Sequence, residues 1–168
     1  MRTLYAPFDC TATMKSGSSD VYQHEIPGGQ YTNLHFQAYS MGLADQFRDV
    51  KSAYADANQL LGNIIKVTPS SKVVGDLAQF MVHNDLSADD VKDKASELSF
   101  PNSVIDMMQG GLGWPEGGFP EPLRTDIVGD RETFVDRPGR TMDDVDFKAI
   151  TRQLQTQFRN LYITKETV

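Results

Sequence analysis

The sequence has 168 residues, 39% of them hydrophobic, and a formal net charge of −7, which suits one domain with a buried core. Its charges are dispersed without a basic cluster, which argues against a nucleic-acid partner and an anionic membrane surface, and no apolar run reaches the roughly 20 residues of a membrane span. The single cysteine, Cys10, excludes an internal disulfide framework and fits a reducing compartment.

Two helices are predicted in the first half of the chain. Residues 1–30 show no sustained period, but after them Leu34, Ala38 and Met41 recur at helical spacing and should share one face. A second helix is predicted from apolar residues three and four positions apart, and it should stop at Gly62. These apolar residues are Phe47, Val50, Tyr54, Ala57 and Leu61.

Three further helices should follow. The first begins at about Ser71 and ends near His83, the second begins at Ser87, and the third begins near Pro101. The glycine- and proline-rich residues 109–122 are typical of an ordered loop, in which Trp114 is either a packing anchor or a partner contact. The apolar face predicted for the first of these helices contains Val73, Val74, Leu77, Ala78 and Met81.

The last part of the chain is predicted to be a linker and a helix. Residues 126–142 are charged and irregular, and Asp143 with Asp144 should then cap a helix whose apolar stripe runs from Phe147 to Leu161. Alternating β-branched runs are nearly absent. The sequence therefore predicts a mainly α fold with long ordered loops, too short for a complete (β/α)₈ barrel, which needs at least about 200 residues.

The histidines offer no metal site by pattern. His24, His35 and His83 stand in none of the spacings that bind zinc, and no cysteine accompanies them. We therefore expect no metal ligand in this chain.

The segment Thr68-Pro69-Ser70-Ser71-Lys72 allows two interpretations. In the structural one, Ser70 or Ser71 caps the helix and Pro69 sets the turn. In the chemical one, Thr68 relays a proton between two bases, and Lys72 with the helix N-terminus stabilises an oxygen that gains negative charge, with a hydrogen bond from Ser71.

Several strings together carry a resemblance to a known family. They closely resemble the C-terminal part of the carboxyltransferase domain of the pyruvate carboxylase family, over most of residues 4–125. The strings are APFDCTATMKSG at 6–17, SDVY at 19–22, HEIPGGQYTNL at 24–34, FQA at 36–38, IKVTPSSK at 65–72, GDLAQF at 75–80, LSFP at 98–101 and GGFPEP at 117–122.

The resemblance implies a fold and a reaction. In that family a metal-containing (β/α)₈ TIM barrel is followed by a helical funnel that leads to the active site. Residues 1–125 would be this C-terminal funnel part, 126–142 a linker and 143–168 an outer C-terminal helix. Carboxybiotin, delivered on a carrier domain, gives its carboxyl group to enolised pyruvate, and oxaloacetate is formed.

Residue roles are implied position by position. The family's proton-relay threonine matches Thr68, which would pass a proton from the pyruvate methyl group to biotin nitrogen. Its biotin-binding serine and lysine match Ser71 and Lys72, and a pocket glutamine matches Gln30. The family's metal ligands and carboxylated lysine lie on barrel strands that this sequence lacks, so no metal ligand is matched.

The resemblance also implies partners that lie outside this chain. They are the barrel with its divalent metal, an ATP-dependent biotin carboxylase domain and the biotin carrier domain. We expect a fragment of a homo-oligomeric enzyme that is inactive alone and acts in the cytoplasm, or in the mitochondrial matrix of a eukaryote. Two alternatives stay open: a segment of the oxaloacetate decarboxylase α subunit or of the transcarboxylase subunit, and a non-catalytic helical module that docks a carrier domain.

Overall fold

The computed structural model describes residues 19–158. Cys10, the string at 6–17 and Leu161 lie outside this range. The chain divides into two compact units, residues 1–137 and 138–168, and each is described by itself. Residues 19–158 contain helices and turns and no β-strand, so the prediction of a mainly α fold is confirmed.

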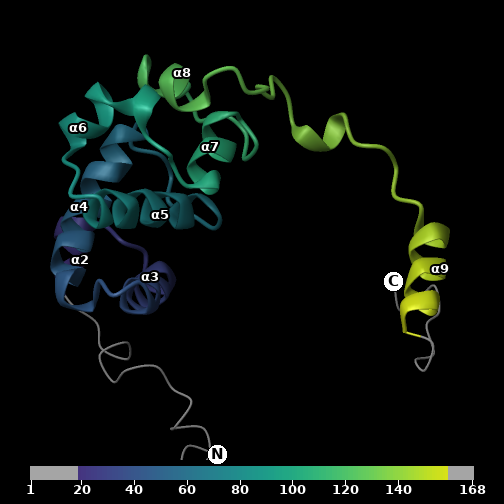
Figure 1. Cartoon of the computed structure of the whole chain (residues 1–168), viewed down its shortest axis with the longest axis horizontal. Coiled ribbons are helices and arrows are strands. Elements are labelled where there is room, and N and C mark those ends of the chain that lie inside the picture. The colour runs from purple at the N-terminus through teal and green to yellow at the C-terminus, as the bar shows by residue number, and fades with distance from the viewer. Residues whose placement is uncertain (1–18, 159–168) are drawn as a thin grey trace, which may run out of the picture. The chain divides into compact units, whose positions relative to one another are not determined.

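The first unit is built around helix α5 (Ser70–His83), which packs along α4 (Phe47–Leu60). In Figure 1, α2 and α3 lie on one side of α5, and α6, α7 and α8 lie on the other. The other elements of this unit are α2 Val21–His24, α3 Gly28–Ser40, α6 Ala88–Asp93, α7 Asn102–Met108 and α8 Leu123–Val128, with 3₁₀ turns η3 at Ala44–Gln46 and η4 at Ala95–Glu97.

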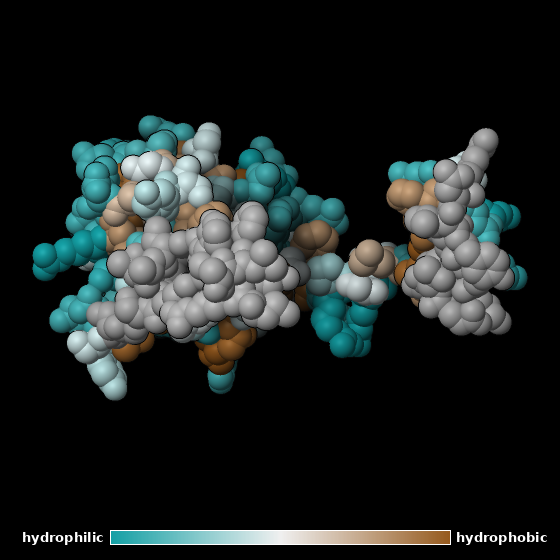
Figure 2. All heavy atoms as spheres, turned by 90° about the horizontal axis from the view of Figure 1, so that it is seen from below, coloured by the Kyte–Doolittle hydropathy of each residue, from teal (hydrophilic) through white to brown (hydrophobic). Residues whose placement is uncertain are grey.

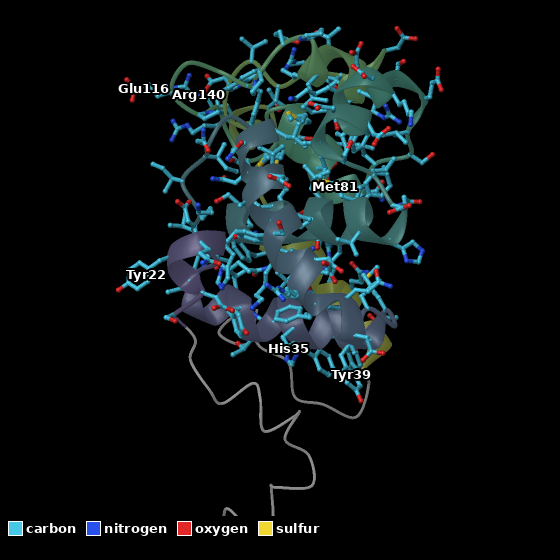
Figure 3. All side chains as sticks on the ribbon, turned by 90° about the vertical axis from the view of Figure 1, so that its left-hand side faces the viewer. Tyr22, His35, Tyr39, Met81, Glu116 and Arg140 are labelled. Atoms are coloured by element: carbon cyan, nitrogen blue, oxygen red, sulfur yellow. The ribbon has the colours of Figure 1, made fainter. Side chains whose placement is uncertain are left out.

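The predicted apolar face of α5 is buried in the core. Figure 3 shows Met81 among the helices, and only 1% of its surface is exposed. Leu34 and Ala38 of α3 and Tyr54 of α4 are fully buried in the same core. The helix is therefore held mainly by packing, at about 0.8 kcal/mol for each buried methylene group. The buried face consists of Val73, Val74, Leu77, Ala78 and Met81.

Met41 does not join the face of Leu34 and Ala38 as predicted. It is 48% exposed, because α3 ends at Ser40 and Met41 is already the residue that follows the helix. The 3.6-residue period no longer applies once the backbone leaves the helix.

The loop that follows α7 is ordered, as predicted, and Trp114 anchors it. The indole N–H of Trp114 donates to the carbonyl oxygen of Phe134 at 2.7 Å, and the ring packs on Phe119 with a centroid distance of 5.6 Å. The guanidinium of Arg124 lies 4.8 Å from the centroid of the same ring, and its Nε donates to the carbonyl oxygen of Met108 at 3.1 Å. Trp114 is thus a packing anchor of this loop.

The predicted N-terminal cap is correct for helix α6 and wrong for the last helix that the structure describes. Ser87 caps α6, and Asp90 completes a capping box with it; the Lys94 ammonium and Ser87 hold the pKa of Asp90 well below its ordinary value. In the second unit the prediction of Asp143 or Asp144 as the cap is wrong. Helix α9 (Phe147–Gln157) is capped by Asp146, whose carboxylate accepts from the Ala149 N–H at 3.0 Å. A 3₁₀ turn, η5 at Pro138–Arg140, precedes it.

The first unit exposes apolar side chains beside its polar ones. Figure 2, which views the α2 and α3 side, shows brown apolar atoms among teal hydrophilic ones. Tyr22 is 89% exposed and Tyr39 59% exposed, and Figure 3 shows both pointing away from the helices. Within residues 19–158, no helix has the length and hydropathy needed to cross a bilayer.

Candidate functional site

The loop before α5 is fixed by Ser70. Its hydroxyl lies 2.6 Å from the carbonyl oxygen of Ile65 and 2.7 Å from that of Val67, and it accepts from the Val67 N–H at 3.1 Å. Pro69, not a serine, precedes the first residue of α5, and no side chain caps this helix. The expectation that Ser70 or Ser71 caps α5 is therefore wrong, because the Ser70 hydroxyl points back into the loop.

The predicted site residues around this loop differ in accessibility. Thr68 is exposed, and the side chain of Lys72 is 53% exposed, one helical turn later. Ser71 is buried, with only 4% of its surface exposed, and its carbonyl oxygen accepts a long hydrogen bond of 3.4 Å from the Tyr54 hydroxyl. Thr68 and Lys72 can thus meet a ligand in the chain as it stands, whereas the Ser71 side chain lies inside.

Tyr54 supports the start of α5 from within the core. Burial raises the pKa of its hydroxyl well above the ordinary value, so the group stays protonated and keeps the hydrogen that it donates to the Ser71 carbonyl oxygen. This contact ties the first turn of α5 to α4.

The structure brings together two strings that are far apart in the sequence. The Lys66 ammonium, in the loop before α5, lies 2.6 Å from the Glu25 carboxylate at the end of α2. The hydrogen bond from Lys66 and its charge lower the pKa of Glu25. The HEIPGGQ segment is therefore linked directly to the loop that carries Thr68.

Gln30 reaches the same region from α3. It is 9% exposed, and a Cβ atom at Gly75 would lie 2.7 Å from its Nε2 atom. Gly75 stands one turn after Ser71, on the same face of α5. The amide nitrogen of Gln30 has no hydrogen-bond partner among the described residues. A buried donor without a partner is costly, so this nitrogen suits an acceptor supplied by a ligand or another chain segment.

Asp76 links Lys72 to α7. Its Oδ2 atom forms an ion pair with the Lys72 ammonium and accepts a hydrogen bond from the Ser103 hydroxyl at 2.6 Å. Only 17% of the Asp76 side chain is exposed. Neither Asp76 nor Ser103 follows from the sequence reasoning, although the GDLAQF string contains Asp76.

Two cavities lie beside this region rather than in it. One, of about 640 Å³ between α2 and α4, is lined by His24, Arg48 and Lys51, and another, of about 390 Å³, lies against Ser70 and Trp114. Neither is lined by Thr68, Ser71, Lys72 or Gln30. Because Thr68 and Lys72 are both exposed, this part of the candidate site is an open surface, and enclosing a small ligand there would require a second wall.

In residues 19–158, no group of three or more His, Cys, Asp or Glu side chains is placed to hold a metal ion. The three histidines lie in different surroundings. His24 and His35 contact the aromatic rings of Tyr31 and Phe47, and His83 is exposed at the end of α5. The side chains gathered at the candidate site carry hydroxyl, ammonium, amide and carboxylate groups.

We expect the folded protein to lose stability at mildly acidic pH because of His24. Burial, and next the Lys51 charge, lower the pKa of His24 below 6.5, while its Nδ1 accepts from the Ile26 N–H at 3.0 Å. The imidazole of His24 therefore binds a proton more readily in the unfolded chain than in the folded one. The stabilisation that is present above pH 6.5 is lost as the pH falls through the pKa of His24 in the folded protein. In urea unfolding, a His24→Asn variant should lose less stability between pH 7 and 5 than the unaltered protein. His83→Gln, at an exposed position, is the control, and equal pH slopes for all three proteins would contradict the prediction.

At Gly75, α3 and α5 approach so closely that an added side chain would have to displace Gln30 and Leu34. A Cβ atom there would lie 2.7 Å from Gln30 Nε2 and 3.0 Å from Leu34 Cδ1. We expect Gly75→Val to lower the free energy of unfolding by about 1–3 kcal/mol, measured by urea unfolding. Gly28→Ala is the matched control, because nothing lies within 4 Å of its added methyl group. Adding Gln30→Ala should recover part of the loss, and no recovery would place the strain elsewhere.

Known proteins match this arrangement closely. The family described as "Conserved carboxylase domain" matches residues 21–168. The chain is 60% identical over 153 residues to human mitochondrial pyruvate carboxylase and 58% identical over 159 residues to pyruvate carboxylase of Schizosaccharomyces pombe. These matches cover 91% and 94% of the chain. It spans 13% of the length of either relative.

Solved structures give the same result. The carboxyl transferase domain of Rhizobium etli pyruvate carboxylase matches with a TM-score of 0.89 and 43% identity, over 99% of this chain and 28% of that one. A second structure of that domain, with pyruvate and biocytin, has the same score, identity and coverage. The helical fold and the ordered loop before α5 thus define a segment of a carboxyl transferase domain. The chain belongs to the conserved carboxylase domain family.

Proposed function

We propose that this chain forms the helical part of a biotin-dependent carboxyltransferase that moves a carboxyl group from carboxybiotin to pyruvate and yields oxaloacetate. The observation that carries the proposal is its 60% identity to a pyruvate carboxylase over 153 residues. The exposed positions of Thr68 and Lys72 support it.

Thr68 is the proposed proton relay. A hydroxyl can accept a proton on its oxygen while it donates its own hydrogen, so Thr68 can take a proton from the pyruvate methyl group and pass one to a nitrogen acceptor. Biotin, when bound, would supply the carboxyl group and then this nitrogen. Because Ser70 fixes the loop through both Ile65 and Val67, the Thr68 backbone is held in one place for this transfer.

Lys72, Ser71 and Gln30 are the proposed biotin-binding residues. The Lys72 ammonium and the N-terminus of α5 both favour an oxygen that gains negative charge. The unpartnered amide nitrogen of Gln30 fits an oxygen acceptor such as that of a ureido group. Ser71 is buried, so it would contribute through the local shape unless its hydroxyl turns outward.

The rest of the reaction is assigned to other parts of a longer protein. The open surface around Thr68 lacks a second wall, and the exposed apolar side chains of Ile65 and Val67 in the same loop, 82% and 60% exposed, suit contact with the barrel of a carboxyl transferase domain. We propose that the barrel supplies the divalent metal, that a biotin carboxylase domain uses ATP, and that a carrier domain delivers biotin. The complete enzyme would be a homo-oligomer in the cytoplasm or the mitochondrial matrix. Residues 1–125 would be the funnel part, 126–142 the linker and 143–168 the outer helix.

The test is complementation between this chain and a separately expressed barrel fragment. We expect the mixture, supplied with pyruvate and a carboxylated carrier domain, to form oxaloacetate, and each part alone to form none. Carrier binding without turnover in the mixture would favour a docking module instead. Oxaloacetate formation by this chain alone would contradict the assignment of the metal to another segment.

A further inference from the structure

Asp76 shares one oxygen between two donors from different helices. The Lys72 ammonium and the Ser103 hydroxyl both contact Oδ2 of Asp76, the latter at 2.6 Å. Lys72 and Asp76 are on α5, whereas Ser103 is on α7. The Asp76 side chain is 17% exposed and the Lys72 side chain 53% exposed, so a mostly buried carboxylate holds a half-exposed ammonium.

The stability of α5 does not explain this arrangement. A lysine four residues before an acid is the less favourable order for a helical ion pair. Lys72 also lies in the first turn, where the helix dipole disfavours a cation. Surface ion pairs of this type contribute little to stability. The lysine is therefore placed where it weakens the helix rather than strengthens it.

We infer that Asp76, held by Ser103, is a positioning residue that sets the location of the Lys72 ammonium at the candidate site. The inference rests on the proposed function of Lys72. A lysine side chain loses rotamer entropy when it is ordered, and the Asp76 contact imposes this order before a ligand arrives. An ammonium has three N–H donors, so the contact with Asp76 leaves two for an oxygen of the ligand.

Asp76 has a second consequence for the site through its charge. The carboxylate lies next to the Lys72 ammonium and also accepts the hydrogen bond of the Ser103 hydroxyl from α7. Lys72 thus remains a donor for a ligand oxygen that gains negative charge. The contact also couples α7 to the first turn of α5, so the position of Ser103 controls the geometry of Lys72.

The experiment measures pyruvate-dependent discharge of carboxybiotin in a complete carboxylase that contains this segment. Asp76→Asn should reduce kcat for the transfer about tenfold, and the KM for pyruvate should change less than about twofold. Asp76→Glu should recover part of the rate, because it restores the charge. Ser103→Ala, a smaller change, should lower the rate about threefold. Rates are normalised to carboxybiotin formed with ATP, and thermal unfolding checks that each variant is folded.

A double-mutant cycle separates positioning from packing. In a Lys72→Ala background, Asp76→Asn should change the transfer rate less than about twofold, because its effect acts through the lysine. Asp89→Asn, which alters the exposed Asp89–Lys92 pair on α6, is the matched control and should leave the rate unchanged. A tenfold loss that persists without Lys72, or Asn that outperforms Glu, would assign Asp76 to packing and overturn the inference. An unchanged rate in Lys72→Ala itself would instead contradict the proposed function.

Discussion

Replacing Thr68 with alanine should reduce carboxyl transfer to pyruvate by about 10²–10⁴-fold, the range typical of a lost proton-transfer group. The side chain is exposed, so the substitution removes the hydroxyl without opening a cavity in the core. The loop should keep its shape, because Ser70 and not Thr68 makes the bonds to Ile65 and Val67. The measurement is pyruvate-dependent oxaloacetate formation in the complete enzyme, with ATP-dependent biotin carboxylation intact.

Two variants test whether the hydroxyl of Thr68 is the cause. Thr68→Ser keeps the hydroxyl and should retain the rate within about tenfold. Thr68→Val keeps the size and branching but not the hydroxyl, and it should fail as Thr68→Ala does. If pyruvate carboxylation continues nearly unchanged in Thr68→Ala, Thr68 is only a turn residue.

Much of the helical fold could be predicted because periodicity reports burial. The stripe around Leu77 on α5 is one long face that excludes water, and its spacing appears directly in the sequence. Ser87 was equally clear, since its hydroxyl and the Asp90 carboxylate act within four residues. Such features depend on neighbours along the chain.

Helix boundaries and short helices were harder to predict. Helix α8 (Leu123–Val128) crosses the predicted boundary between residues 125 and 126. Its six residues are too few for a period to stand out, and tertiary contacts of Leu123 and Ile127 stabilise it. Asp146, rather than Asp143 or Asp144, caps α9. The sequence alone does not show which of these neighbouring aspartates has its carboxylate within reach of the first N–H groups of the helix.

The candidate site was only partly predictable for a related reason. Thr68 and Lys72 stand in one short segment, but the contact of Gln30 with Gly75 joins α3 to α5 across 45 positions of sequence. Ser103 is 27 residues from Asp76. Nothing in the local pattern of either pair encodes its partner, because the helices must pack before these side chains meet. Resemblance supplied Gln30, and only the structure supplied Asp76 and Ser103.

Removing the charge of Lys72 should be the next largest effect. Loss of one group that stabilises a developing negative charge typically costs 10²–10³-fold in rate. Since half of this side chain is exposed and water screens it, we expect about 10²-fold or slightly less for Lys72→Met in the pyruvate-dependent transfer.

Lys72→Met has a similar length without the ammonium, so it tests the charge rather than the shape. Lys72→Arg keeps the charge but places it on a planar group that fits the site differently, and its rate should lie between those of the methionine variant and the unaltered enzyme. Lys92→Met, on an equally exposed lysine of α6, should leave the transfer unchanged. If the Lys72 and Lys92 variants behave alike, the first-turn lysine of α5 belongs to the solvated surface, and Thr68 would have to act without it.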